Sequence, residues 1–116
     1  MLIVEDDDLS IIVMRKIFQD EFEITVCDSA EKFYEEYKNN FDIIIMDVSL
    51  RGARNGFELI KEIKELPSYT GTPIICFTAH ADMKARKNAM ESGSDLFISK
   101  PVSNSALKEA VNSLIR

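Results

Sequence analysis

Short apolar runs rich in β-branched residues recur along the chain, and polar residues bound each of them. Runs of this length without alternation are typical of strands that are buried on both faces. The runs are LIV at 2–4, EITV at 23–26, DIIIM at 42–46, PIICF at 73–77 and LFIS at 96–99. They predict five short strands.

Between these runs, apolar residues stand three and four positions apart, which is the helical period. The segments with this pattern lie at 9–18, around Phe33 and Tyr34, at 59–66 and at 107–114. Residues 82–92 hold few apolar side chains and give the weakest helical pattern. Each interval between strands therefore predicts one helix.

Local signals mark where several of these helices begin and end. Asp28 with Glu31, and Asn55 with Glu58, have the spacing of a capping box, in which an N-cap side chain and an acid three residues later satisfy backbone N–H groups. Pro67 follows the third helix and Gly93 the fourth, as stop signals should.

Strands that alternate with helices in 116 residues predict a parallel sheet with right-handed helical crossovers. The predicted fold class is therefore a doubly wound α/β domain with a five-stranded parallel sheet. Residues 1–116 contain no repeat, linker or low-complexity tract, so we expect one domain. Because the chain opens directly in a strand, this domain fits a piece cut from a longer protein.

Composition and charge narrow the class of protein. Hydrophobic residues make up 46% of the chain and charged residues 29%, which is ordinary for a soluble globular domain. The net charge of -6 argues against direct binding of nucleic acid, which requires a basic face. No apolar run approaches the roughly 20 residues of a membrane span, and the first residues lack the basic start of a secretion signal. We therefore expect a cytoplasmic protein with no membrane insertion.

The two cysteines, Cys27 and Cys76, lie inside apolar runs and not in a C-x-x-C pair. This placement favours buried thiols in a reducing compartment over a disulfide or a metal site.

Polar residues with different chemistry follow four of the predicted strands. In open parallel sheets, functional groups gather beyond the carboxyl ends of the strands, where the strand order reverses. The residues at these ends are Glu5 to Asp8 after the first strand, Asp47 after the third, Thr78 and Ala79 after the fourth, and Lys100 and Pro101 after the fifth. We expect them to meet at one edge of the sheet.

This combination suits the chemistry of phosphoryl transfer. Carboxylates held close together repel one another and stay ionised only where a cation neutralises them. Glu5, Asp6 and Asp47 supply the hard oxygen ligands that Mg²⁺ takes in proteins. A hydroxyl at Thr78 and an ammonium at Lys100 suit the oxygens of a phosphoryl group. An aspartate carboxylate can itself attack phosphorus and form an acyl phosphate.

At this point the motifs carry a family resemblance. LIVEDD, MD at the end of the third strand, FTA and SKP, in this order and spacing, resemble the receiver domain of two-component response regulators, the CheY-like superfamily. The resemblance covers essentially the whole chain, and the combination is specific although each motif alone is weak. It implies the flavodoxin-like (βα)5 fold with strand order 2-1-3-4-5.

The resemblance also implies roles for individual residues. Asp47 would be the phosphoacceptor, and Glu5 and Asp6 would hold Mg²⁺ together with Asp47 and the backbone carbonyl of Ser49. Thr78 would be the hydroxyl that moves on phosphorylation.

The end of the chain carries two further implied roles. Lys100 would contact the phosphate and would precede Pro101 in a cis peptide. Phe97, three residues before this lysine, matches the switch aromatic of the family. An aromatic residue in the last strand is also commonly part of the core, so both interpretations of Phe97 stay open.

The implied function is that of a signalling phosphoacceptor and not of an enzyme with a separate substrate. Asp47 would receive a phosphoryl group from the phosphohistidine of a sensor histidine kinase or of a phosphotransfer protein, and would lose it by slow self-catalysed hydrolysis. The added charge of roughly -2 would change a surface within residues 82–115, where a downstream output domain or protein would bind.

The sequence departs from the family pattern after the acceptor. Most receivers have a proline where Arg51 stands and a glycine eight residues after the acceptor, whereas Gly56 comes nine residues after Asp47. We expect the one-residue-longer loop at 52–55 to change loop shape or access and to leave the ligands in place, because Ser49 precedes it. His80, two residues after Thr78, occupies a position that tunes the lifetime of the acyl phosphate in receivers, although a surface loop residue is the simpler interpretation.

Simpler interpretations exist for other motifs. The run at 5–8 could be a solvated acidic turn at the start of a helix, which is the better interpretation for Asp7 and Asp8. Thr78 could be a helix cap, and Lys100 a loop residue. The basic residues Lys84, Arg86 and Lys87 could be a solvated helix face or a docking surface.

Two other functions compete with the phosphoacceptor. A receiver that acts as a phosphorylation-independent interaction module is usually marked by loss of an acid, the acceptor or the lysine, and none is lost here. A phosphatase of the haloacid dehalogenase type needs D-x-D after its first strand, whereas this chain has Asp47 after the third strand, followed by Val48 and Ser49. The sequence also lacks a Gly-rich phosphate loop.

Overall fold

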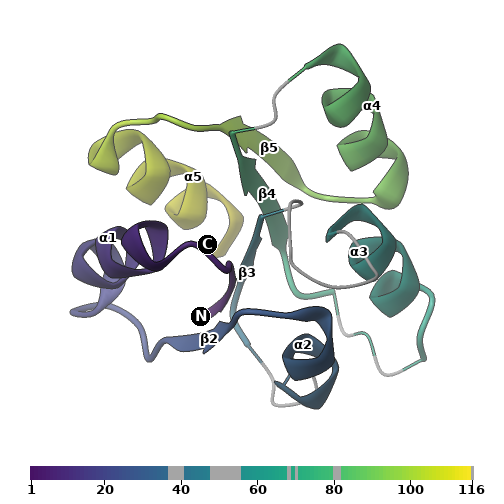
Figure 1. The fold of residues 1–116 in the computed structure, drawn as a ribbon, viewed down its shortest axis with the longest axis horizontal. Coiled ribbons are helices and arrows are strands. Elements are labelled where there is room, and N and C mark those ends of the chain that lie inside the picture. Colours follow the sequence, from purple (N-terminus) through teal and green to yellow (C-terminus); the bar gives the residue numbers. More distant parts are fainter. Residues whose placement is uncertain (37–40, 48–55, 68, 70, 80–81, 116) are drawn as a thin grey trace.

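The computed structural model describes residues 1–36, 41–47, 56–67, 69, 71–79 and 82–115. Strands and helices alternate along the chain (Figure 1). The elements are β1 (Leu2–Val4), α1 (Asp8–Phe18), β2 (Thr25–Cys27), α2 (Ala30–Glu36), β3 (Ile44–Met46), α3 (Gly56–Lys64), β4 (Ile74–Thr78), α4 (Met83–Ser92), β5 (Leu96–Ser99) and α5 (Asn104–Ile115). All five strands are parallel and lie in the order β2-β1-β3-β4-β5. The doubly wound, flavodoxin-like fold is confirmed.

Helices cover both faces of the sheet, which explains why the strands read as continuous apolar runs. Helices α1 and α5 lie on one face, and α2, α3 and α4 lie on the other (Figure 1). Successive side chains of a strand point to opposite faces. Leu2 and Val4 therefore join the core beneath α2, α3 and α4, whereas Ile3 joins the core beneath α1 and α5. Both cores need apolar residues, so no position in β1 is left for a polar side chain.

The order of the strands reverses between β1 and β3. Strand β1 pairs with β2 on one side and with β3 on the other, and Val4 lies opposite both Cys27 and Met46. The ladder continues beyond these pairs, because Glu5 N–H donates to Cys27 O at 2.9 Å and Asp47 N–H donates to Val4 O at 2.9 Å. The register thus holds Glu5 and Asp47 on neighbouring strands at the carboxyl edge of the sheet.

The start of α2 differs from the sequence prediction. The side chain of Ser29, not that of Asp28, accepts a hydrogen bond from Lys32 N–H at 3.3 Å, and the helix begins at Ala30. Asp28 instead forms an exposed ion pair with Lys32, with 3.3 Å between Oδ1 and Nζ. The second predicted cap, Asn55, lies outside the described residues.

Helix α4 forms where the apolar pattern is weakest, because both of its ends are fixed locally. The Asp82 side chain accepts a hydrogen bond from Ala85 N–H at 2.7 Å, which satisfies the first turn. Gly93 closes the helix with a φ of 96°, in the left-handed region that favours glycine. Since Asp82 is the cap, the interpretation of Thr78 as a helix cap is wrong. Thr78 is instead the fully buried last residue of β4.

Both cysteines are buried free thiols, as the sequence predicts. Burial raises the pKa of Cys27 and of Cys76 to about 11. We expect iodoacetamide to label neither thiol at an appreciable rate at pH 8 in the native protein, because reaction needs an exposed thiolate. In urea both thiols should be labelled at the rate of a free cysteine, and intact mass follows the labelling. Equal labelling rates with and without urea would contradict the burial.

Candidate functional site

The carboxyl ends of β1, β3, β4 and β5 bring four of the predicted site residues into one cluster. Lys100 follows β5, and its backbone N–H donates to Thr78 O at the end of β4 at 2.8 Å. Its ammonium reaches across the sheet edge and lies 2.9 Å from Glu5 Oε2 and 3.3 Å from Asp47 Oδ2. Residues far apart in the sequence therefore converge on one cation.

These polar groups are withdrawn from solvent. Glu5 is 2% exposed, Asp47 is 8% exposed and Thr78 is fully buried. They are three of the four buried polar residues in the part of the chain that the structure describes. Buried ion pairs contribute little net stability, since desolvation of the charges offsets their attraction. A structural role alone does not account for this cluster, and perturbed charged groups of this kind are typical of functional sites.

The Lys100 ammonium has a polar acceptor for each of its three hydrogens. Besides the two carboxylates, Ser10 Oγ of α1 lies 3.3 Å from Lys100 Nζ. The ring of Phe77 lies beneath the ammonium, at 5.1 Å from Nζ to the ring centroid. The Lys100 side chain is thus in contact with α1 and β4 as well as with the two carboxylates.

The ionisation of the cluster follows from burial and charge. Burial raises the pKa of Glu5 to about 7, the hydrogen bond from Lys100 opposes the increase, and the negative charge of Asp47 adds to it. Burial lowers the pKa of Lys100, but the hydrogen bond to Glu5 and the charges of Glu5 and Asp47 outweigh burial, so the net pKa is raised. Lys100 therefore stays charged, and one cation is shared between two carboxyl groups.

The donor set fits a small hard cation by its chemistry. Glu5 and Asp47 converge on Lys100, so two carboxyl groups face one lysine, and Asp6 follows Glu5 directly in the sequence. An excess of carboxylate oxygen over positive charge is what Mg²⁺ neutralises in proteins. Within the described residues no three His, Cys, Asp or Glu side chains are already grouped closely enough to hold a metal ion. The fourth predicted ligand, the carbonyl of Ser49, lies outside the described residues.

Phe97 lies in β5 and packs half-buried against the core beneath α2, α3 and α4. The guanidinium of Arg86 in α4 lies 4.9 Å from the centroid of its ring. This contact links the basic residues of α4 to the predicted switch aromatic, so at least one of these residues is not simply solvated. The switch role of Phe97 stays a prediction, and so do the roles of His80, Arg51 and residues 52–55, which lie outside the described residues.

The sequence did not reveal two of these contacts. Ser10 stands in the otherwise apolar run LSIIV, and the isolated hydroxyl was its only signal. Arg86 was noted as part of a basic stripe, but its contact with Phe97 depends on how α4 packs against β5. Both contacts depend on tertiary packing that sequence spacing does not specify.

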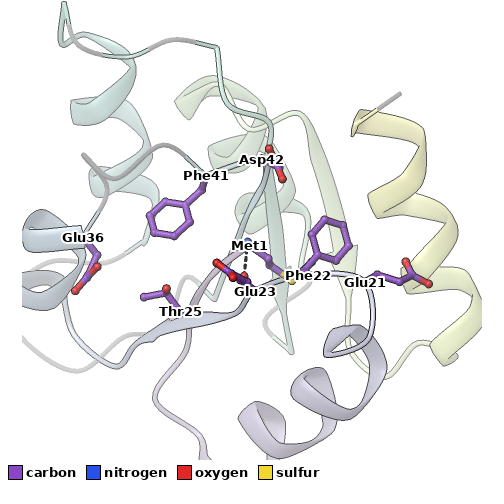
Figure 2. A pocket seen from close by; sticks show the side chains of 8 residues that line it. All are labelled: Met1, Glu21, Phe22, Glu23, Thr25, Glu36, Phe41 and Asp42. Atoms are coloured by element: carbon purple, nitrogen blue, oxygen red, sulfur yellow. Dashed lines mark hydrogen bonds between the residues drawn. The ribbon is translucent and has the colours of Figure 1, made fainter.

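A cavity of about 420 Å³ lies at the edge of the sheet opposite the cluster around Lys100 (Figure 2). Its walls come from the residues that precede β1 and β3 and from those around the start of β2, with the ring of Phe41 directed into it. The Met1 ammonium donates to Glu23 O at 2.8 Å in this cavity. Since it lies at the amino ends of the strands, it is separate from the cluster around Lys100.

Comparison with known proteins identifies the family of this chain. The family model of the response regulator receiver domain matches residues 1–112. The chain belongs to this family. It is 31% identical over 121 residues to the chemotaxis protein CheY of Halobacterium salinarum, an alignment that covers 99% of this chain and 95% of that protein. This membership decides against a phosphatase of the haloacid dehalogenase type.

Other receiver proteins extend the comparison. The chain is 30% identical over 118 residues to the regulatory protein VanRB of Enterococcus faecalis, covering all of this chain and 52% of that protein. It therefore spans about half the length of this relative. The same fold occurs in the receiver domain of the sensor histidine kinase PA1611 from Pseudomonas aeruginosa, with a TM-score of 0.88 and 23% identity. The match covers 98% of this chain and 94% of that one. The crystal structure of that domain holds a magnesium ion in its active site cleft.

Receiver domains belong to two-component signalling, so this chain is a receiver domain of that kind of pathway. No helix among the described residues is long and apolar enough to cross a membrane.

Proposed function

We propose that this receiver domain is a phosphoacceptor and that Asp47 takes the phosphoryl group. The observation that carries the proposal is the partly buried ammonium of Lys100, which contacts both Asp47 and Glu5 at the edge where the strand order reverses. A carboxylate next to a fixed cation is placed to receive a group that brings further negative charge.

The reaction would proceed by attack of an Asp47 carboxylate oxygen on phosphorus. An O–P bond forms, the P–N bond of a phosphohistidine breaks, and the imidazole leaves with the electron pair and takes up a proton. Lys100 and the Thr78 hydroxyl would contact oxygens of the transferred group, whose charge they offset. Glu5, Asp6, Asp47 and the Ser49 carbonyl would hold Mg²⁺, which neutralises phosphoryl charge when bound.

The partners in this proposal follow from the same chemistry. The donor is a sensor histidine kinase or a phosphotransfer protein, and the domain of residues 1–116 acts without a separate substrate. The output is a domain or protein that binds within residues 82–115, where Arg86 already contacts the ring of Phe97. The acquired charge of roughly -2 is the signal that such a surface reads.

Acetyl phosphate tests the proposal without a cognate kinase. In the presence of Mg²⁺, we expect the intact mass of the domain to rise by about 80 Da, the mass of one phosphoryl group. Removal of the metal by a chelator should prevent the gain, since the carboxylate cluster would then repel the donor. Sodium chloride, added to the chelated sample to restore the ionic strength, controls for the loss of salt.

An unchanged mass, under conditions in which a receiver of known activity is phosphorylated, would overturn the proposal. The phosphorylation-independent interaction module would then be the better description of this chain.

A further inference from the structure

A closed ring of hydrogen bonds joins Lys100 to the first turn of α1. One oxygen of Glu5 accepts from Lys100 Nζ, and the other accepts from Asp7 N–H at 3.1 Å. The carboxylate of Asp7 accepts from Ser10 N–H at 2.9 Å, which is the N-cap bond of the helix. The ring closes because Ser10 Oγ lies 3.3 Å from Lys100 Nζ.

Through Ser10, this ring of hydrogen bonds gives the lysine an uncharged contact on α1 in addition to its two carboxylate contacts. A lysine side chain has a flexible four-carbon stem, and ordering it costs conformational entropy. The Ser10 hydroxyl is carried by a helix start that is fixed by the cap at Asp7. Of the three acceptors that the described part of the chain offers the ammonium, Ser10 is the only neutral one and the only one that is not a predicted ligand of Mg²⁺.

A cavity lies beside the contact between Ser10 and Lys100. Ser10 and Lys100 line one cavity of about 230 Å³ between α1 and the start of α5. The other lining residues are apolar except for Asn104, and they include Val13, Phe77 and Val102. Without the hydroxyl, one N–H of the ammonium would face this apolar wall or would have to recruit water, and its position would be less defined.

We propose that Ser10 is a positioning residue, which holds the Lys100 ammonium over Asp47 and thereby speeds phosphoryl transfer. The inference rests on the proposed phosphoacceptor function. When a phosphoryl group arrives, Lys100 exchanges its contacts with the carboxylates for contacts with phosphoryl oxygens. Ser10 keeps the remaining N–H and prevents the stem from turning into the cavity.

The test compares Ser10→Ala with Ser10→Thr, which keeps the hydroxyl. At saturating Mg²⁺, we expect the alanine variant to be phosphorylated by acetyl phosphate about three- to tenfold more slowly, which is the factor supplied by one modest hydrogen bond. The threonine variant should stay within about twofold of the wild type. Alanine is a good helix former, and the N-cap bond uses the backbone of Ser10, so thermal melting should show a folded protein for both variants.

A second readout separates positioning from a general structural effect. The ammonium of a lysine held by three acceptors exchanges its hydrogens with water slowly enough to be followed by ¹⁵N NMR. We expect the hydrogens of Lys100 to exchange faster in Ser10→Ala, and at the wild-type rate in Ser10→Thr.

The outcomes distinguish this inference from the function on which it rests. If the wild type gains no phosphoryl group, the proposed function fails and the inference with it. If the wild type is phosphorylated and Ser10→Ala matches its rate, only the inference fails. A slower alanine variant with unchanged exchange at Lys100 would also overturn the inference, because Ser10 would then act by another route.

Discussion

Asparagine in place of Asp47 should abolish the gain of a phosphoryl group from acetyl phosphate and leave the protein folded. The amide that replaces the carboxylate has no oxygen with the charge needed to attack phosphorus. It has nearly the same shape, and its carbonyl oxygen can still accept a hydrogen bond from Lys100, which lies 3.3 Å from the carboxylate in the native protein. Intact mass after incubation with Mg²⁺ and acetyl phosphate measures the result, and thermal melting checks the fold.

The matched control is Asp20→Asn, which makes the same chemical change at an exposed residue just after α1. This variant should be phosphorylated at the wild-type rate, because Asp20 lies outside the cluster around Lys100. A mass gain in Asp47→Asn equal to that of the control would mean that another residue accepts the phosphoryl group. Loss of the gain in both variants would point to an effect of net charge and not of the acceptor.

The sequence predicted the elements of this fold because both faces of the sheet are buried. A run such as PIICF has no polar position, and only a strand covered by helices on both sides makes use of such a run. Periodicity could not give the order of the strands, since the five runs are alike in composition and length. The order 2-1-3-4-5 was implied by the resemblance to receivers and is confirmed by the pairing of β1 with both β2 and β3.

Element boundaries were harder to predict, as the start of α2 illustrates. Asp28 and Ser29 are both good N-cap residues, and sequence spacing to Glu31 favoured Asp28. The pairing of Cys27 with Val4 carries β2 two residues beyond Thr25, so the chain turns later than the sequence suggests. Tertiary pairing therefore selects Ser29 over its neighbour.

In the candidate site, too, residues at the ends of strands could be predicted from the sequence, whereas contacts that depend on tertiary packing could not. Glu5, Asp47 and Lys100 could be predicted because each stands directly after a strand, and parallel strands end at one edge. The contact between Lys100 and Ser10 could not, because it depends on the direction of a flexible lysine stem and on the packing of α1 beside α5. Glu5 could be assigned to the site, but its raised pKa depends on a burial that sequence does not reveal.

The second large effect concerns the core that supports the site. Leu59 of α3 is fully buried against the sheet, whereas Leu9 of α1 is 69% exposed. We expect Leu59→Ala to lower the free energy of unfolding by about 2–5 kcal/mol, through lost burial and the cavity that remains. Leu9→Ala makes the same change in a helix and should cost no more than about 0.5 kcal/mol.

Urea unfolding followed by far-ultraviolet circular dichroism measures both variants against the wild type. A domain of this size has a total stability of about 5–15 kcal/mol, so the expected loss at Leu59 is a large fraction of it and should move the midpoint markedly. Because α3 packs against β4 and α4 through this core, the weakened packing should also reach the strand that carries Thr78. Equal midpoints for the two alanine variants would contradict the assignment of α3 to the buried core.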